Sequence, residues 1–161
     1  MNGRDLLQFL RAQKWAVQAS TTLVDHHPQA AVIGVAITGH LEIIFDTMGD
    51  TRKAVNLRAN PKIALVIGWD QEQTVQIDGI ADEPQGEALA RLKKAYFERF
   101  PEGRERESWE NIAYFRVHPT WIRYSDFRGA TPHGQTWAGP GLKGLIDEAS
   151  TVGEASVTIQ P

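Results

Sequence analysis

The chain has 161 residues, the usual size of a single domain and enough to bury a substantial hydrophobic core. It contains no cysteine, which excludes disulfides, thiolate metal sites and cysteine nucleophiles. Its formal net charge of −3 gives no sign of nucleic-acid binding, which usually goes with a basic surplus. No apolar run reaches the roughly 18 residues that span a membrane, and the N-terminus lacks the apolar stretch of a signal peptide. We therefore expect a cytoplasmic protein that binds neither nucleic acid nor a membrane.

The first half of the sequence predicts one helix followed by several strands. Apolar residues recur at helical spacing between Leu6 and Leu10, so residues 3–13 are expected to form a helix. Short runs rich in Val, Ile and Thr then predict strands at residues 16–24, 31–37, 41–46, 63–69 and 75–80. A brief helix over 51–59 interrupts them and ends before Pro61, because proline cannot continue a helix. The pattern favours an antiparallel barrel or sandwich over parallel βαβ units.

The second half predicts a longer helix, two strands and an irregular tail. An apolar stripe at helical spacing predicts the helix, and its members are Leu89, Leu92, Tyr96 and Phe100. After this helix we expect a charged loop at 101–110 and strands at 112–117 and 121–127. Residues 129–161 are rich in Gly, Pro, Thr and Ser, so we expect a loosely held extension with a short helix near 142–149. The chain is therefore divided into a domain over 1–128 and an extension over 129–161.

The most informative motif is Thr-Met-Gly-Asp-Thr-Arg-Lys at 47–53, between a predicted strand and a predicted helix. Asp50 or Thr51 is placed to cap the helix, and the free N–H groups at a helix start already attract anions. Arg52 adds a bidentate fork and Lys53 a point charge, which together suit a terminal phosphate. Basic residues in a first helical turn are electrostatically unfavourable unless an anion offsets them. The alternative is a solvated surface helix without a ligand.

This motif and its surroundings resemble the pyridoxamine 5′-phosphate oxidase-like split-barrel family of flavin-binding proteins. The resemblance runs from about residue 5 to Phe127. It includes the segment Val-Asn-Leu-Arg-Ala-Asn-Pro-Lys at 55–62 and the closing strands from His118 onward. The resemblance implies a mainly β fold, a six-stranded antiparallel split barrel with flanking helices, in which the domain over 1–128 binds FMN.

In that family a hydroxyl, an arginine and a lysine hold the phosphate of FMN. Carried over to this sequence, the resemblance assigns those roles to Thr51, Arg52 and Lys53. It also assigns a flavin contact to Thr47, at the end of the preceding strand. Family members build the flavin site between two protomers, so the resemblance implies a homodimer. A small barrel with continuous apolar strands also has surface that an oligomer would bury.

Two departures from the family pattern bear on the substrate. The oxidases place an arginine and a lysine on the second strand, where this chain has Ala31 and Ala36. They also end in an Arg-x-His-like motif that grips the substrate, whereas Arg128 and His133 stand at a different spacing here. The resemblance therefore supports flavin binding better than it supports oxidation of a vitamin B6 phosphate.

These observations predict an FMN-dependent oxidoreductase acting on a small molecule, with catalytic residues that the sequence does not reveal. One alternative is a genuine oxidase of pyridoxamine or pyridoxine 5′-phosphate, and another is a non-enzymatic flavin- or heme-related binding module linked to stress. A deazaflavin could also replace FMN. We expect no metal site, because His26 and His27 sit in a turn without a carboxylate at ligand spacing.

Overall fold

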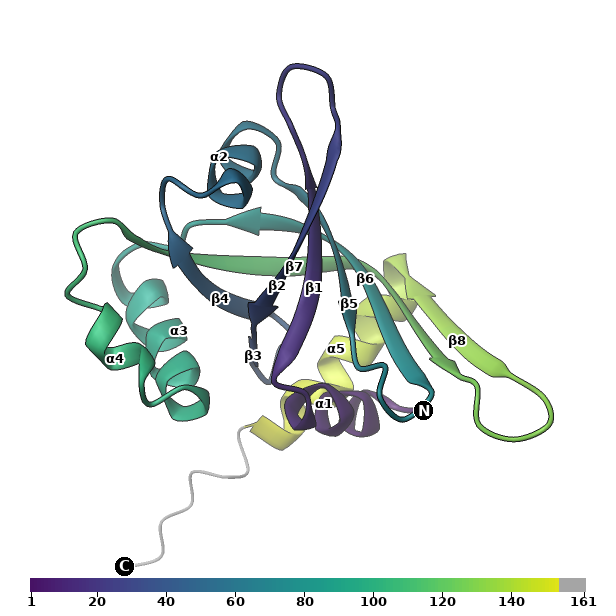
Figure 1. Ribbon diagram of the computed structural model, residues 1–161. Helices are drawn as coiled ribbons and strands as arrows, with labels where there is room; N and C mark the ends of the chain where they lie inside the picture. The colour runs from purple at the N-terminus through teal and green to yellow at the C-terminus, as the bar shows by residue number, and fades with distance from the viewer. Residues whose placement is uncertain (154–161) are drawn as a thin grey trace, which may run out of the picture.

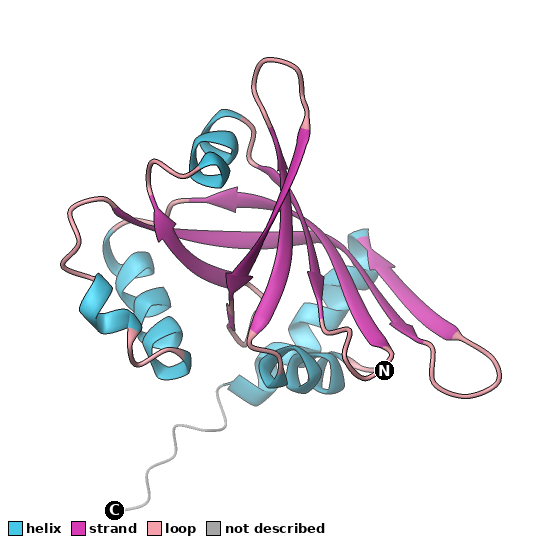
Figure 2. Ribbon diagram, viewed as in Figure 1, coloured by secondary structure: helices cyan, strands magenta, loops and turns pink. Residues whose placement is uncertain are grey.

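The structure is a computed structural model that describes residues 1–153. It consists of a strongly curved antiparallel sheet with helices on its outer side and at its lower end (Figures 1 and 2). The strands are β1 Trp15–Thr21, β2 Pro28–Gly34, β3 Ala36–Ile37, β4 Ile43–Met48, β5 Lys62–Ile67, β6 Gln73–Asp82, β7 Ile112–Asp126 and β8 His133–Ala138. The helices are α1 Gly3–Ala12, α2 Arg52–Ala59, α3 Gly86–Arg99, α4 Gly103–Arg106 and α5 Gly139–Gly153.

The sheet curls because its two end strands are consecutive in the chain. The strand order is β2-β1-β5-β6-β7-β4-β3, with β8 beside β7, and only Val35 separates β2 from β3. Val35 donates its N–H to the carbonyl of Lys14 at 3.0 Å. Gly34 leaves room for the ring of Phe100, because a Cβ at this position would lie 2.8 Å from Phe100 Cζ. The apolar run predicted as one strand over 31–37 is therefore bent into two.

Alternating side chains fill the inside of the curved sheet. Along β6, Val75, Ile77, Gly79 and Ala81 are buried, while the residues that alternate with them are more exposed. The rings of Phe45 on β4 and Phe115 on β7 stack with their centroids 5.4 Å apart. This alternation is the signature of an antiparallel sheet with one face packed on a core. The mainly β, barrel-like fold with flanking helices is thus confirmed.

The closing strands differ from the prediction. Residues 112–126 form the single strand β7, although two strands were expected there. The pairing with β6 shifts register between Asp78 and Gly79, and Thr120 is the extra residue on β7. A β-bulge accommodates Pro119, which has no N–H to donate to a regular ladder. The predicted charged loop contains the short helix α4.

The predicted loose extension is wrong over residues 133–153, although the helix expected near 142–149 is present within α5. There, β8 pairs with β7 and α5 packs against α1. The described part of the chain has eight strands, whereas the predicted barrel has six, and β8 is one of the additional strands. Leu142, Leu145 and Ala149 of α5 are buried in the same core as the barrel strands. A Cβ at Gly3 would come within 2.2 Å of the Leu145 carbonyl, which shows how closely α1 and α5 approach. Residues 154–161 of the predicted extension lie outside the described part.

Candidate FMN site

The β4–α2 junction brings the predicted site residues together. Thr47 ends the buried part of β4, and its Oγ1 lies 3.0 Å from Oγ1 of Thr51. Thr51 Oγ1 also lies 2.8 Å from the carbonyl of Met48, to which it donates. Because hydroxyl hydrogens rotate, both threonines can turn a donor toward an anionic oxygen. The junction therefore presents two paired hydroxyl groups at the start of α2.

The N-terminus of α2 has no side-chain cap. Thr51 occupies the cap position, but its hydroxyl makes no capping hydrogen bond, and Asp50 makes none either. The prediction that one of these side chains caps the helix is therefore wrong. The first helical hydrogen bond runs from Val55 N–H to the Thr51 carbonyl at 3.0 Å. The N–H groups of the preceding turn have no partner inside the helix, and such groups bind anions.

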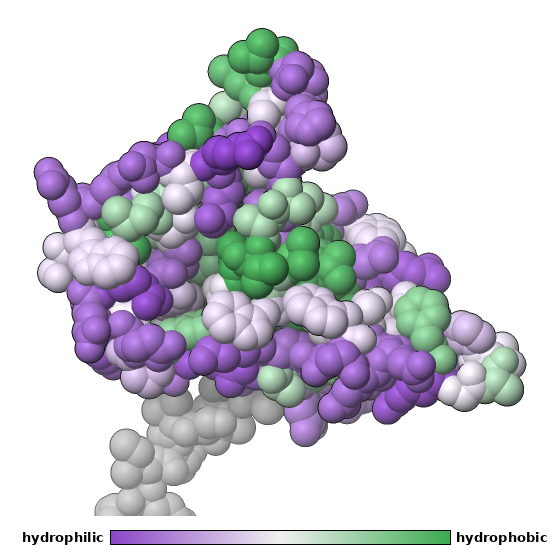
Figure 3. Space-filling model, in the orientation of Figure 1, coloured by the Kyte–Doolittle hydropathy of each residue, from purple (hydrophilic) through white to green (hydrophobic). Residues whose placement is uncertain are grey.

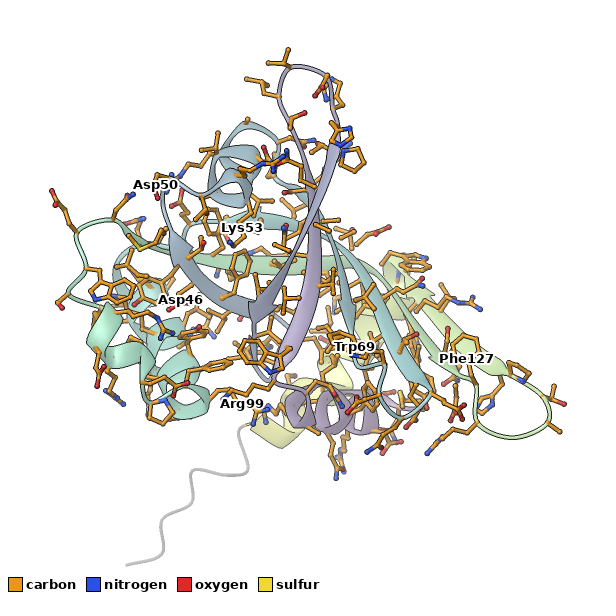
Figure 4. The ribbon with its side chains drawn as sticks, viewed as in Figure 1. Asp46, Asp50, Lys53, Trp69, Arg99 and Phe127 are labelled. Atoms are coloured by element: carbon orange, nitrogen blue, oxygen red, sulfur yellow. The ribbon has the colours of Figure 1, made fainter. Side chains whose placement is uncertain are left out.

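The basic side chains of the junction differ in environment. Arg52 is exposed, whereas Lys53 is partly buried, and its burial lowers the pKa of its ammonium while the nearby Asp46 carboxylate opposes that shift. Neither residue forms an ion pair with a carboxylate within residues 1–153. In Figure 4, Lys53 lies below α2 between β4 and β2, while Asp50 lies at the outer rim. Both positive charges are therefore available to a bound anion.

Helix α2 is fixed to its surroundings by polar contacts that the sequence did not reveal. Arg58 binds Glu83 through two hydrogen bonds of 2.8 and 2.7 Å and also donates to the carbonyl of Gly49. Asn56 donates to Ser20 Oγ at 3.3 Å and to Gln29 Oε1 at 2.9 Å. These contacts fix the C-terminal half of the helix, and the bond to the Gly49 carbonyl ties it to the junction that carries the hydroxyl pair. Asn56 and Arg58 both lie within the segment 55–62 that carried the family resemblance.

Asp46 links the junction to α3 and α4. It points to the opposite side of β4 from Thr47, as consecutive strand residues do. Its two carboxylate oxygens accept hydrogen bonds from Tyr96 Oη at 2.8 Å and from Arg106 Nε at 2.9 Å. Burial and the adjacent Asp46 charge raise the pKa of Tyr96, so its phenol stays protonated. Because Arg106 already pairs with Asp46, this carboxylate competes less with a ligand for Lys53.

The two alanines that replace basic family residues lie in different places. Gln29, two residues before Ala31 on the same face of β2, accepts a hydrogen bond from Asn56, so Ala31 also faces the α2 side. Ala36 is buried with Leu92 and other residues under α3. Only the first of these substitutions therefore removes a charge on the side of the phosphate motif.

The basic residues near the C-terminus are engaged elsewhere. Arg128 forms a bidentate pair with Asp126, at 2.9 and 2.6 Å, which keeps the pKa of this carboxyl far below its usual value. His133 Nε2 lies 3.9 Å from the same carboxylate. Asp126 ends β7, whereas Ile112 at its other end pairs with Met48. A strand of 15 residues is roughly 45 Å long, so these side chains lie far from the junction in one protomer.

An apolar patch covers the outer face of β1, β2 and β5. Val17 pairs with Val32 on one side and with Val66 on the other, which places three valines in a row across the sheet. Trp15 and Trp69 line the same shallow cavity next to this row. Val32 is 63% exposed, Trp15 51% and Trp69 46%. Figure 3 shows a green area on the face of the molecule where β1, β2 and β5 lie, and we call Val17, Val32, Val66, Trp15 and Trp69 the outer patch.

Among residues 1–153, no group of three or more His, Asp or Glu side chains is placed to hold a metal ion. His26 and His27 are both exposed in the connection between β1 and β2. No helix in that part of the chain is long and apolar enough to cross a membrane.

Residues 4–126 match the sequence model of the family described as pyridoxamine 5′-phosphate oxidase. The chain belongs to this family. The match contains the whole β4–α2 junction and ends at the last residue of β7, so β8 and α5 lie outside it. No curated protein matches the chain by sequence.

Solved structures with the same fold are described as binding different ligands, heme in some and FMN in others. A heme-binding protein from Mycobacterium smegmatis aligns with a TM-score of 0.77 and 14% identity, over 91% of this chain and 61% of that one. This chain thus spans about three fifths of the mycobacterial protein. A pyridoxamine 5′-phosphate oxidase-related, FMN-binding protein from Nostoc punctiforme aligns with a TM-score of 0.62 and 11% identity, over 84% of this chain and 86% of that one. HutZ, the heme storage protein of Vibrio cholerae, aligns with a TM-score of 0.64 and 17% identity, over 71% of this chain and 87% of that one.

Proposed function

We propose that the protein is an FMN-binding oxidoreductase whose β4–α2 junction holds the phosphate of FMN. The observation that carries the proposal is the hydroxyl pair of Thr47 and Thr51, 3.0 Å apart, at a helix start without a side-chain cap. Arg52 and Lys53 follow directly and have no carboxylate partner within residues 1–153. Hydroxyls, backbone N–H groups, a guanidinium and an ammonium form a donor set that fits a dianionic phosphate.

Each residue has a distinct part in this proposal. Thr47 and Thr51 donate hydrogen bonds, and Lys53 contributes a charge whose partial burial reduces screening by water. Arg52 closes the site from the solvent side. FMN supplies the electron or hydride transfer, so the chain needs few acid–base groups of its own. Arg58 and Asn56 keep α2 in place and thereby fix the position of the phosphate.

The proposal predicts that FMN binds more tightly than riboflavin, which lacks the phosphate. We expect an affinity difference of at least tenfold in a fluorescence titration of the apoprotein, because several charge-assisted hydrogen bonds are lost with the phosphate. Salt should weaken FMN binding more than riboflavin binding. Equal affinities for the two flavins would contradict the assignment of the junction as a phosphate site.

We further propose that two protomers pair through the outer patch and complete the flavin site together. The three valines and two exposed tryptophans of the outer patch lie together on one face of the sheet, and contiguous exposed apolar surfaces often mark protein–protein contacts. Val32→Glu places a charge at the patch and is expected to convert the dimer to monomers and to release FMN. Val24→Glu is the matched control, since Val24 is 94% exposed at the tip of the β1–β2 hairpin, outside the patch.

Sedimentation velocity at micromolar concentration, with absorbance detection of the flavin, measures both effects. A wild-type monomer that retains FMN would contradict the dimer, as would a Val32→Glu variant that remains dimeric.

The alternative functions have weaker support. An oxidase of pyridoxamine 5′-phosphate must hold a second phosphate against the flavin, yet Ala31 is uncharged and Arg128 is bound to Asp126. A non-enzymatic flavin- or heme-related binder and a deazaflavin enzyme would use the same fold. The absorption spectrum and mass of the chromophore that copurifies with the protein distinguish FMN, deazaflavin and heme directly.

A further inference from the structure

A second cavity lies between α1, β3 and α3. Its volume is about 710 Å³, within the range of small-molecule sites. Arg11 and Gln13 come from the end of α1, the residues around Ala36 come from β3, and Arg91 to Arg99 come from α3. None of the four FMN-site residues lines it. The cavity is therefore separate from the proposed phosphate site.

Positive charge dominates the cavity wall. Its charged side chains are Arg11, Arg91, Lys94, Glu98 and Arg99, four basic residues and one acidic residue. This concentration is notable in a chain whose formal net charge is −3. Like charges three residues apart on a helix, such as Arg91 and Lys94, repel each other. An anion between α1 and α3 would offset that repulsion.

Two of the guanidinium groups are held in place without being neutralised. Arg11 Nε donates to the Ile37 carbonyl at 3.1 Å, and Arg99 Nη2 donates to the Ala12 carbonyl at 3.4 Å. Figure 4 shows Arg99 in the space between α3 and α1. Within residues 1–153, these two arginines and Lys94 form no ion pair with a carboxylate. Backbone carbonyls orient a guanidinium but leave its charge for another anion.

The fourth basic residue has a shared partner. Arg91 lies 3.4 Å from Glu42 Oε2, and the other oxygen of Glu42 lies 3.4 Å from Arg116. Val35, Ala36 and Ala95 also line the cavity, and we call this apolar part of the lining the cavity floor. A ligand there therefore meets both cationic and aliphatic side chains.

From this arrangement we propose that the cavity binds a small organic anion with at least two negative charges. The guanidinium forks of Arg11 and Arg99 and the ammonium of Lys94 bind its phosphate or carboxylate oxygens, and its uncharged part packs on the cavity floor. The site is independent of FMN binding. The proposed anion site can therefore be tested regardless of the outcome of the FMN experiments at the junction.

The test is isothermal titration of the full chain, saturated with FMN so that the β4–α2 junction is occupied, with pyrophosphate and, separately, with citrate. We expect saturable binding of one anion per chain that weakens as salt is added. The double variant Lys94→Gln/Arg99→Gln should bind at least tenfold more weakly. The double variant Arg4→Gln/Lys143→Gln removes the same charge from exposed positions outside the cavity and should bind within twofold of the wild type.

Further variants separate this cavity from the FMN site. Arg52→Ala should leave pyrophosphate affinity unchanged, and Lys94→Gln/Arg99→Gln should leave FMN affinity unchanged. Tighter binding of pyrophosphate identifies a phosphate ligand, and tighter binding of citrate identifies a polycarboxylate. The proposal is overturned if neither anion saturates, if both double variants lose the same affinity, or if only Arg52→Ala weakens binding.

Discussion

Leu145→Ala is expected to lower the free energy of unfolding by about 2–5 kcal/mol, the usual cost of truncating a buried leucine. Leu145 is buried on α5 in the same core as Leu6 and Leu10 of α1. The close approach of Gly3 to the Leu145 carbonyl leaves α1 little freedom to collapse into the cavity that alanine would create. The expected loss in the free energy of unfolding is therefore larger than at a buried position whose neighbours can move into the vacated space.

Urea unfolding followed by circular dichroism measures this change. Lys143→Ala is the matched control, because Lys143 lies on the same helix but its side chain is 78% exposed. Substitutions at such surface positions usually change stability by less than about 0.5 kcal/mol. If both variants unfold at the same urea concentration, α5 is not part of the cooperative core and residues 133–153 behave as the loose extension that the sequence predicts.

The barrel strands could be predicted because their signals are local. In β6, buried Val75 and Ile77 alternate with polar residues, and this period of two is visible in the sequence. The sequence predicts two strands, at 112–117 and 121–127; Pro119 lies between them, and proline is uncommon inside strands. The bulge at Thr120 keeps the strand continuous, and a bulge depends on the partner strand, which the sequence does not identify.

The C-terminal region was harder to predict because its stability is tertiary. Leu142, Leu145 and Ala149 do follow helical spacing, but Gly139, Pro140 and Gly141 precede them and suggest an irregular segment. Packing against α1 overrides these weak propensities, as it does for most helices in proteins. A single sequence does not show that two helices more than 120 residues apart share a core.

The same difference between local and tertiary signals separates the β4–α2 junction from the basic cavity. Thr47, Thr51, Arg52 and Lys53 lie within seven residues, so a strand–helix junction brings them together automatically. By contrast, the pair of Asp46 with Arg106 joins residues that are 60 positions apart. The basic cavity likewise combines α1 with α3, and only the folded chain brings those charges together.

Arg52→Ala is expected to weaken FMN binding by about 1.5–3 kcal/mol, the contribution of hydrogen bonds to a charged group. This change corresponds to a loss of roughly 10- to 150-fold in affinity. The fold should remain intact, because Arg52 is exposed and its side chain forms no ion pair with a carboxylate within residues 1–153. Unfolding at the wild-type urea concentration would establish that the loss arises at the ligand.

Riboflavin provides the decisive comparison for this variant. A residue that binds the phosphate should affect FMN alone, so Arg52→Ala should bring the FMN affinity toward the unchanged riboflavin affinity. Arg52→Lys should recover part of the loss, because a lysine keeps the charge but not the planar fork. Arg4→Ala, an exposed arginine on α1, controls for the general loss of one positive charge. If Arg52→Ala weakens both flavins equally or neither of them, Arg52 does not contact the phosphate, and the junction must act through its hydroxyls and Lys53 alone.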